Sequence, residues 1–85
     1  MENEKVLVEV YIPAAQLRSD FYLPLQCKVI DVKMAVLAMY KEHNFFKNTD
    51  LSFLHIYNGD TGQALDFKQI LLHCGIRNGT CLFML

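Results

Sequence analysis

Three cysteines and three histidines are the side chains in this sequence best suited to metal binding or nucleophilic catalysis. A disulfide framework needs an even number of cysteines and a zinc site needs close pairs such as Cys-x-x-Cys, and neither pattern occurs. His73 and Cys74 are neighbours, and in a helical turn their side chains point about 100° apart, which keeps them from pairing. We therefore predict buried, reduced thiols, no metal, no cofactor and no catalytic residue. The residues considered are Cys27, Cys74, Cys81, His43, His55 and His73.

A catalytic pair, a phosphate-binding loop and a nucleic-acid-binding surface differ in the signals that they leave in a sequence. A nucleophile and a base that meet only across the fold leave no spacing signal, so a catalytic or metal-binding protein using, for example, Cys81 with His55 stays open as an alternative. A phosphate-binding loop is not indicated, because Gly59 and Gly62 lack the lysine that such a loop requires. Eight Lys and Arg stand against nine Asp and Glu, so the basic excess of a nucleic-acid-binding protein is missing. We predict no nucleic-acid partner.

The composition is that of a folded domain. Of the 85 residues, 53% are apolar and 20% are charged, the reverse of the pattern of disordered chains. The length favours one domain over residues 1–85. No run approaches the ~18 apolar residues of a membrane span, and the acidic start differs from a secretory signal. We predict a cytoplasmic protein without direct membrane insertion.

The first part of the chain alternates between apolar and other residues with a period of two. Residues 5–12 predict a strand, and Pro13 ends it because proline cannot donate to the ladder. A connection over residues 14–19 leads to a second predicted strand over residues 20–26, where Pro24 indicates a sheet edge. The face of the first strand that we expect to be buried carries Val6, Val8, Val10 and Ile12.

Residues 29–43 change to the helical period, with Asn44 as the expected stop. The core stripe of this helix is Val29, Val32, Val36, Met39 and Tyr40. A second stripe is Ile30, Met34 and Leu37. Either residues 45–50 and 65–72 pack on the second stripe, or it is a docking surface suited to a homodimer.

The last part of the sequence predicts two further strands. Residues 51–57 alternate, and Asn58-Gly59 is a strong turn signal. Residues 66–72 favour a short helical turn beneath Leu71. After a second Asn-Gly turn, residues 80–85 form the last predicted strand. The order of elements indicates an α+β fold, in which one helix packs across a mixed sheet.

This order, together with two segments, resembles the ubiquitin-like β-grasp fold, with a mixed four- to five-stranded sheet and one helix. The segments are Val29-Ile30-Asp31-Val32-Lys33 at the helix start and Leu71-Leu72-His73-Cys74-Gly75-Ile76-Arg77-Asn78-Gly79-Thr80-Cys81-Leu82 at the close. Within this superfamily the chain is most similar to the small bacterial YukD/EsaB type, where an acidic residue, here Asp20, opens the second strand. Thr80 stands where that branch commonly has Asp.

The resemblance implies a non-enzymatic, cytosolic accessory component of a type VII (WXG100) secretion system. Its partners would be membrane-embedded channel or ATPase components, with a homodimer as a further option. The alternative is a general ubiquitin-like adaptor or scaffold unrelated to secretion. Conjugation requires a flexible tail ending in Gly-Gly, and no Gly-Gly occurs in this sequence, so we expect that the protein is not a modifier.

The predicted sheet has a second apolar face. If Val6, Val8, Val10, Ile12, Leu54, Ile56, Leu82 and Met84 lie under the helix, the opposite face is aromatic where a small mixed sheet is expected to be polar. Large exposed apolar patches mark interaction sites, so this face predicts protein binding, unless residues 60–69 or the N-terminus cover it. In the ubiquitin comparison, His55 would take the place of the central isoleucine. The predicted binding residues are Leu7, Tyr11, Phe53, His55, Tyr57, Phe83 and Leu85, beside Cys81.

Overall fold

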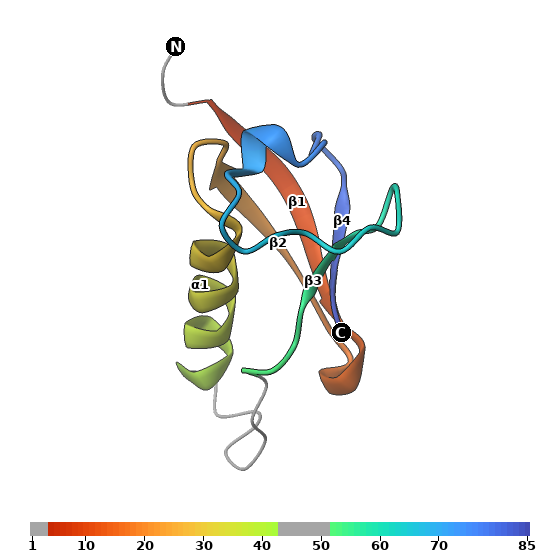
Figure 1. Ribbon diagram of the computed structural model, residues 1–85. Helices are drawn as coiled ribbons and strands as arrows, with labels where there is room; N and C mark the ends of the chain where they lie inside the picture. The colour runs from red at the N-terminus through yellow and green to blue at the C-terminus, as the bar shows by residue number, and fades with distance from the viewer. Residues whose placement is uncertain (1–3, 43–51) are drawn as a thin grey trace.

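The computed structural model describes residues 4–42 and 52–85. Its elements are β1 (Lys5–Ile12), β2 (Leu17–Pro24), α1 (Val29–Glu42), β3 (Ile56–Asn58) and β4 (Cys81–Met84). The strands form one sheet in the order β2-β1-β4-β3, and α1 lies along one of its faces (Figure 1). β1 is parallel to β4, whereas the β1–β2 and β3–β4 pairs are antiparallel. The predicted α+β architecture is confirmed, with four strands.

The connection between β1 and β2 is tighter than predicted. Pro13–Ala15 form a short 3-10 turn, and Gln16 takes a left-handed conformation with φ 54° while its N–H donates to the Pro13 carbonyl at 3.0 Å. The chain therefore reverses at once, and Leu17 pairs with Ile12. The second strand thus begins at residue 17 instead of 20 and ends at 24 instead of 26. It is an edge strand, as Pro24 indicated.

The helix matches its predicted stripe. Val29, Val32, Val36 and Tyr40 are buried, and Met39 is partly buried against them. Asp31 lies in the first turn and Lys41 in the last, where each charge is favourable to the helix dipole. His43 and the predicted stop at Asn44 lie outside the described residues.

The strand predicted over residues 51–57 is wrong in its bounds. Ser52 and Phe53 lie in a turn, and β3 begins only at Ile56. The cause is the partner strand: β4 is short, and Ile56 already faces Met84 near its end. One further backbone pair, between His55 and Leu85, continues the ladder with two hydrogen bonds of 2.9 Å.

The segment after β3 runs along the outer edge of that strand. The Asn58 N–H donates to the Gln63 carbonyl at 2.9 Å, and the Leu65 N–H donates to the Ile56 carbonyl at 2.8 Å. The predicted Asn-Gly turn at Asn58 is confirmed, because residues 59–61 form a turn. The predicted helical turn over residues 66–72 is shorter and later, a 3-10 turn at Leu71–His73, with Leu71 buried.

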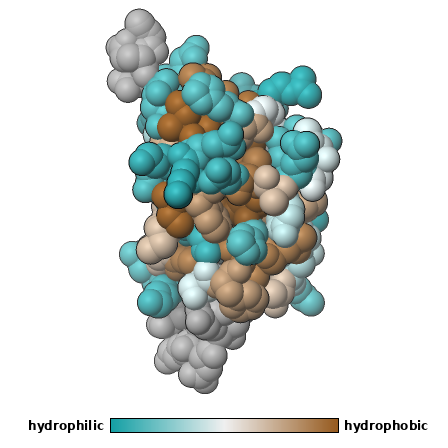
Figure 2. All heavy atoms as spheres, viewed as in Figure 1, coloured by the Kyte–Doolittle hydropathy of each residue, from teal (hydrophilic) through white to brown (hydrophobic). Residues whose placement is uncertain are grey.

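The core lies between α1 and the inner face of the sheet. All eight residues assigned to this face by their alternation are buried: Val6, Val8, Val10, Ile12, Leu54, Ile56, Leu82 and Met84. Figure 2 shows hydrophobic residues across the middle of this view and hydrophilic residues along its upper and left margins.

The second stripe of α1 is only partly covered. Ile30 and Leu37 are half-buried, whereas the Met34 side chain is 60% exposed. Residues 65–72, one of the two segments predicted to pack on this stripe, contact it in part, since the Ile30 N–H donates to the Phe67 carbonyl at 3.1 Å. The other, residues 45–50, lies outside the described residues. Within the described ranges, no helix has the length and apolarity of a membrane span.

Candidate protein-binding surface

Three aromatic side chains form a row on the face of the sheet opposite α1, which we call the outer face. Tyr11 of β1 lies beside Phe83 of β4, and Phe83 lies beside Tyr57 of β3. We call these three residues the aromatic row. Arg18 of β2 pairs with Tyr11, so the register continues the row across all four strands.

Two members of the row are held by side-chain contacts: Tyr11 and Phe83 contact each other, and Tyr11 also contacts Arg18. The rings of Tyr11 and Phe83 meet edge to face, with centroids 5.9 Å apart and planes at 71°. The Arg18 guanidinium lies 4.0 Å above the Tyr11 ring and is bound to Glu9 by an ion pair of 2.9 Å. All three aromatic residues are half-buried. A surface held in this way loses little side-chain entropy when it binds, which favours a docking role.

Next to the aromatic row lies a more acidic row. Glu9 is paired in register with Asp20 on one side and with Cys81 on the other. Burial raises the pKa of the Cys81 thiol above its ordinary value of 9.0, and a hydrogen bond with Glu9 adds to the rise. The thiol therefore stays protonated near neutral pH and is a poor nucleophile.

Sequence analysis missed three outer-face residues, all on β2: Arg18, Asp20 and Tyr22. The side chain of Tyr22 is 69% exposed. Arg18 was missed because the start of the strand was placed three residues too late. Asp20 and Tyr22 lie within the predicted strand, but their place on the outer face follows from the register with β1. Asp20 also lies inside β2 and does not open it, which removes one feature of the resemblance to the YukD/EsaB branch.

Four of the predicted binding residues lie outside the aromatic row. Leu7 is a half-buried neighbour on β1, and its N–H donates to the Asn78 side chain at 2.9 Å. Leu85 is 52% exposed just after β4. Phe53 is 70% exposed but lies in a turn, not in a strand. The fourth, His55, stacks its ring on Phe67 at 5.6 Å, which joins it to the connection between β3 and β4.

The possible cover over residues 60–69 lies beside the sheet and does not cover the aromatic row. Its first part bonds to the edge of β3, and its later part reaches the start of α1, where the Gln69 carbonyl accepts from Val29 at 2.9 Å. Phe67 is held on the helix side by the buried Lys33, whose Nζ lies 4.8 Å from the ring centroid and donates to the Ser52 carbonyl. The other possible cover, the N-terminus, begins with residues outside the described ranges.

The pairing of Cys81 with His55 as nucleophile and base is wrong. His55 exchanges backbone bonds with Leu85, four positions beyond Cys81 on β4, which corresponds to about 13 Å along a strand. Burial also raises the pKa values of Cys27 and Cys74. Among the described residues, no group of three His, Cys, Asp or Glu side chains is placed to hold a metal ion.

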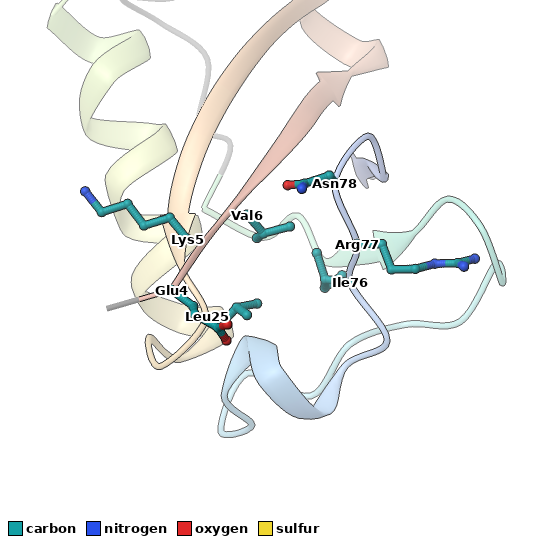
Figure 3. Close-up of a pocket in the computed structure, with 7 residues that line it drawn as sticks. All are labelled: Glu4, Lys5, Val6, Leu25, Ile76, Arg77 and Asn78. Carbon is teal, nitrogen blue, oxygen red and sulfur yellow. The ribbon is translucent and has the colours of Figure 1, made fainter. Parts of the chain in front are cut away.

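A shallow depression of about 350 Å³ lies where the start of β1 meets residues 76–78 (Figure 3). Val6 and Ile76 line it together with charged residues at its rim. In Figure 3 the side chains of Lys5 and Arg77 point to opposite sides, so their charges do not converge on one ligand. Small-molecule sites need a few convergent polar groups, so this depression is a weaker candidate than the outer face.

No protein-family model and no curated protein matches this sequence. Solved structures match over nearly the whole chain. The ubiquitin-like domain of an Arabidopsis thaliana protein is 18% identical, with 96% of this chain and 77% of that chain covered, at a TM-score of 0.72. Ubiquitin of Caldiarchaeum subterraneum is 15% identical, with 96% and 95% covered, at 0.71.

The C-terminal ubiquitin-like domain of mouse tubulin-specific chaperone e is similar to the same extent. It is 16% identical, with 99% of this chain and 88% of that chain covered, and the TM-score is 0.73. At such identities the likeness concerns the arrangement of the backbone, and it agrees with the strand order and the single packed helix described above. The chain has the ubiquitin-like β-grasp fold.

Proposed function

We propose that the protein is a non-enzymatic binding module whose outer face docks a protein partner. The observation that carries this proposal is the aromatic row, three half-buried rings aligned across three strands on a face that the described connections leave open. Aromatic side chains dominate the energetics of protein interfaces. The ion pair between Arg18 and Glu9 supplies a polar rim beside the row.

The proposal is tested by photo-crosslinking in cells of the source organism. A photoreactive phenylalanine analogue is placed at Phe83, and a matched control carries it at Met34, which is exposed on α1. We expect a discrete crosslinked protein from position 83 and none from position 34. Adding Tyr57→Ala should weaken the purified pair by more than about 1 kcal/mol.

Thermal unfolding separates binding from folding in this experiment. If Tyr57→Ala unfolds the domain to the same extent as it reduces crosslinking, the ring belongs to the core and the docking proposal fails. The proposal also fails if position 34 yields the same product as position 83, because the contact would then not be specific to the outer face.

The finer proposal is that this partner belongs to a type VII (WXG100) secretion system. Its support is the close of the sequence, where Leu71, the Gly75-Ile76 pair and Leu82 follow the pattern of the YukD/EsaB branch. Leu71, Ile76 and Leu82 are all buried and therefore serve the core. They support the fold more strongly than they support one branch of it.

The identity of the crosslinked protein decides between this proposal and its alternative. A membrane-embedded channel or ATPase component would support an accessory role in secretion for a cytoplasmic protein. A soluble partner without any link to secretion would favour a general adaptor or scaffold, and it would leave the outer-face proposal intact.

A further inference from the structure

The two edges of the sheet differ in what covers them. The edge of β3 is bonded to Gln63 and Leu65 of the following connection. Among residues 4–42 and 52–85, no such segment lies bonded to the edge of β2, and no backbone hydrogen bond reaches the outward N–H groups of its middle residues. An eight-residue edge strand with free donors and acceptors is a template for pairing with another strand.

The direction of these free groups follows from one hydrogen bond. The Leu25 N–H donates to the Glu4 carbonyl at 3.0 Å and so points toward β1. Backbone groups alternate in direction along a strand, so the N–H and C=O groups of Arg18, Asp20 and Tyr22 point away from β1. Proline at position 24 fits this pattern, since the donor it lacks would also point outward.

We infer that two copies of this chain pair through β2 in an antiparallel register that places Arg18 of each copy opposite Asp20 of the other. Each of these two pairs exchanges two backbone hydrogen bonds, because both residues have outward-facing N–H and C=O groups. Directly opposite side chains of opposite charge stabilise a strand pair. The two four-stranded sheets would become one continuous sheet, with Ser19 at its twofold axis.

The charges on β2 select this register from its neighbours. A shift by one hydrogen-bonded step in one direction places Arg18 opposite its own copy, and a shift in the other direction places Asp20 opposite its own copy. Both arrangements set like charges against each other, which destabilises a strand pair. A further shift pairs Asp20 with Tyr22 and leaves both charges without a partner of opposite sign.

A positive charge opposite Asp20 would be favourable, because another carboxylate lies beside Asp20 in the sheet. Asp20 lies in register beside Glu9, so two carboxylates are neighbours on the outer face. The ion pair of Arg18 at 2.9 Å goes to Glu9. In the proposed dimer, Arg18 of the second copy would lie opposite Asp20 and offset the repulsion between the two carboxylates.

The inner face of β2 supports the same register. Leu17 and Phe21 are half-buried and pack against the core. The register that joins Arg18 to Asp20 also places Leu17 of each copy opposite Phe21 of the other. The apolar layer under the sheet would then continue across the dimer. Ser19, which faces its own copy, is small enough for the close approach of directly opposed side chains.

Sedimentation velocity on the purified full chain tests this inference, from micromolar to millimolar concentration because a strand-edge interface is small. We expect a mass that rises from one chain to two. Arg18→Asp alone and Asp20→Arg alone should each weaken the dimer by at least about tenfold, because each sets like charges opposite each other twice. An equimolar mixture of the two variants should form a heterodimer, and the double variant should regain the homodimer.

Arg77→Asp is the matched control, since it reverses an exposed arginine on the segment before β4 and should leave the dimer unchanged. Thermal unfolding of each variant checks the fold, because Arg18→Asp also removes the contacts with Glu9 and Tyr11. A wild-type chain that stays monomeric throughout would overturn the inference. So would a dimer that survives Arg18→Asp, or a variant mixture that fails to associate. Because the test uses pure protein, its failure leaves the proposed docking of a partner on the outer face untouched.

Discussion

Gly59→Ala should destabilise the fold at the point where β3 and β4 align the aromatic row. A Cβ at this position would lie 2.4 Å from the carbonyl oxygen of Cys81 and 3.3 Å from its carbonyl carbon. Both are backbone atoms of β4, so neither can move aside as a flexible side chain would. The same oxygen accepts a hydrogen bond of 2.7 Å from the Gly59 N–H, which must lengthen when the strands are pushed apart.

The expected loss of stability is about 2 kcal/mol. Overpacking costs about 1–3 kcal/mol, and a weakened hydrogen bond adds about 1 kcal/mol. The lower chain entropy of the unfolded Ala variant returns up to about 1 kcal/mol. In a domain of this size each kcal/mol changes the melting temperature by about 4–8 °C, so the midpoint should fall by about 10 °C.

Circular dichroism melts and urea titrations of both the wild type and the variant measure this change. The control is Gly62→Ala, in the same turn, where an added Cβ meets nothing within 4 Å and the only cost is the left-handed φ of 76°. That cost is about 1 kcal/mol. If Gly59→Ala is no less stable than Gly62→Ala, the close approach of Gly59 to β4 does not limit the fold and the reasoning is wrong.

Thr80→Val should lower the free energy of unfolding by about 1–2 kcal/mol, measured by urea titration, because the buried hydroxyl accepts from the Arg77 N–H at 3.0 Å and donates to Asp60 at 2.8 Å. Thr61→Val, at an exposed position, should change it by much less, and equal losses would refute a special role for the buried hydroxyl. For the thiols, the raised pKa values predict slower labelling by a disulfide reagent at pH 7–8 than free cysteine shows, with rates that climb as the pH passes 9; fast labelling at pH 7 would contradict this for Cys27, Cys74 and Cys81.

Periodicity was enough to predict the core but not the bounds of the strands. The alternation in β1 and the stripe on α1 each depend on one element alone, and all of the residues assigned to the inner face of the sheet are buried. The start of β2 depends instead on the left-handed conformation of Gln16, which no residue type at that position signals. The start of β3 depends on where its partner β4 ends.

The candidate site was predicted in part for the same reason. Tyr11, Tyr57 and Phe83 follow from the alternation of their own strands. Their alignment in one row, and the addition of Arg18, depend on the register between strands, which a single sequence does not contain. His55 was assigned to the outer face by parity, but its stacking on Phe67 is a tertiary contact that parity cannot anticipate.

The position of β4 between β1 and β3 has a consequence for how the chain acquires its fold during synthesis. The β1–β2 hairpin joins residues close in the sequence and can form early. The other neighbour of β1 is β4, and their pairing joins residues far apart in the sequence, such as Glu9 and Cys81. Until β4 emerges from the ribosome, one side of β1 stays unpaired, and the core residues Val6, Val8 and Val10 of β1 stay exposed to water. A nascent chain is therefore exposed to aggregation until β4 has been made, and the sheet is completed in one late, cooperative step.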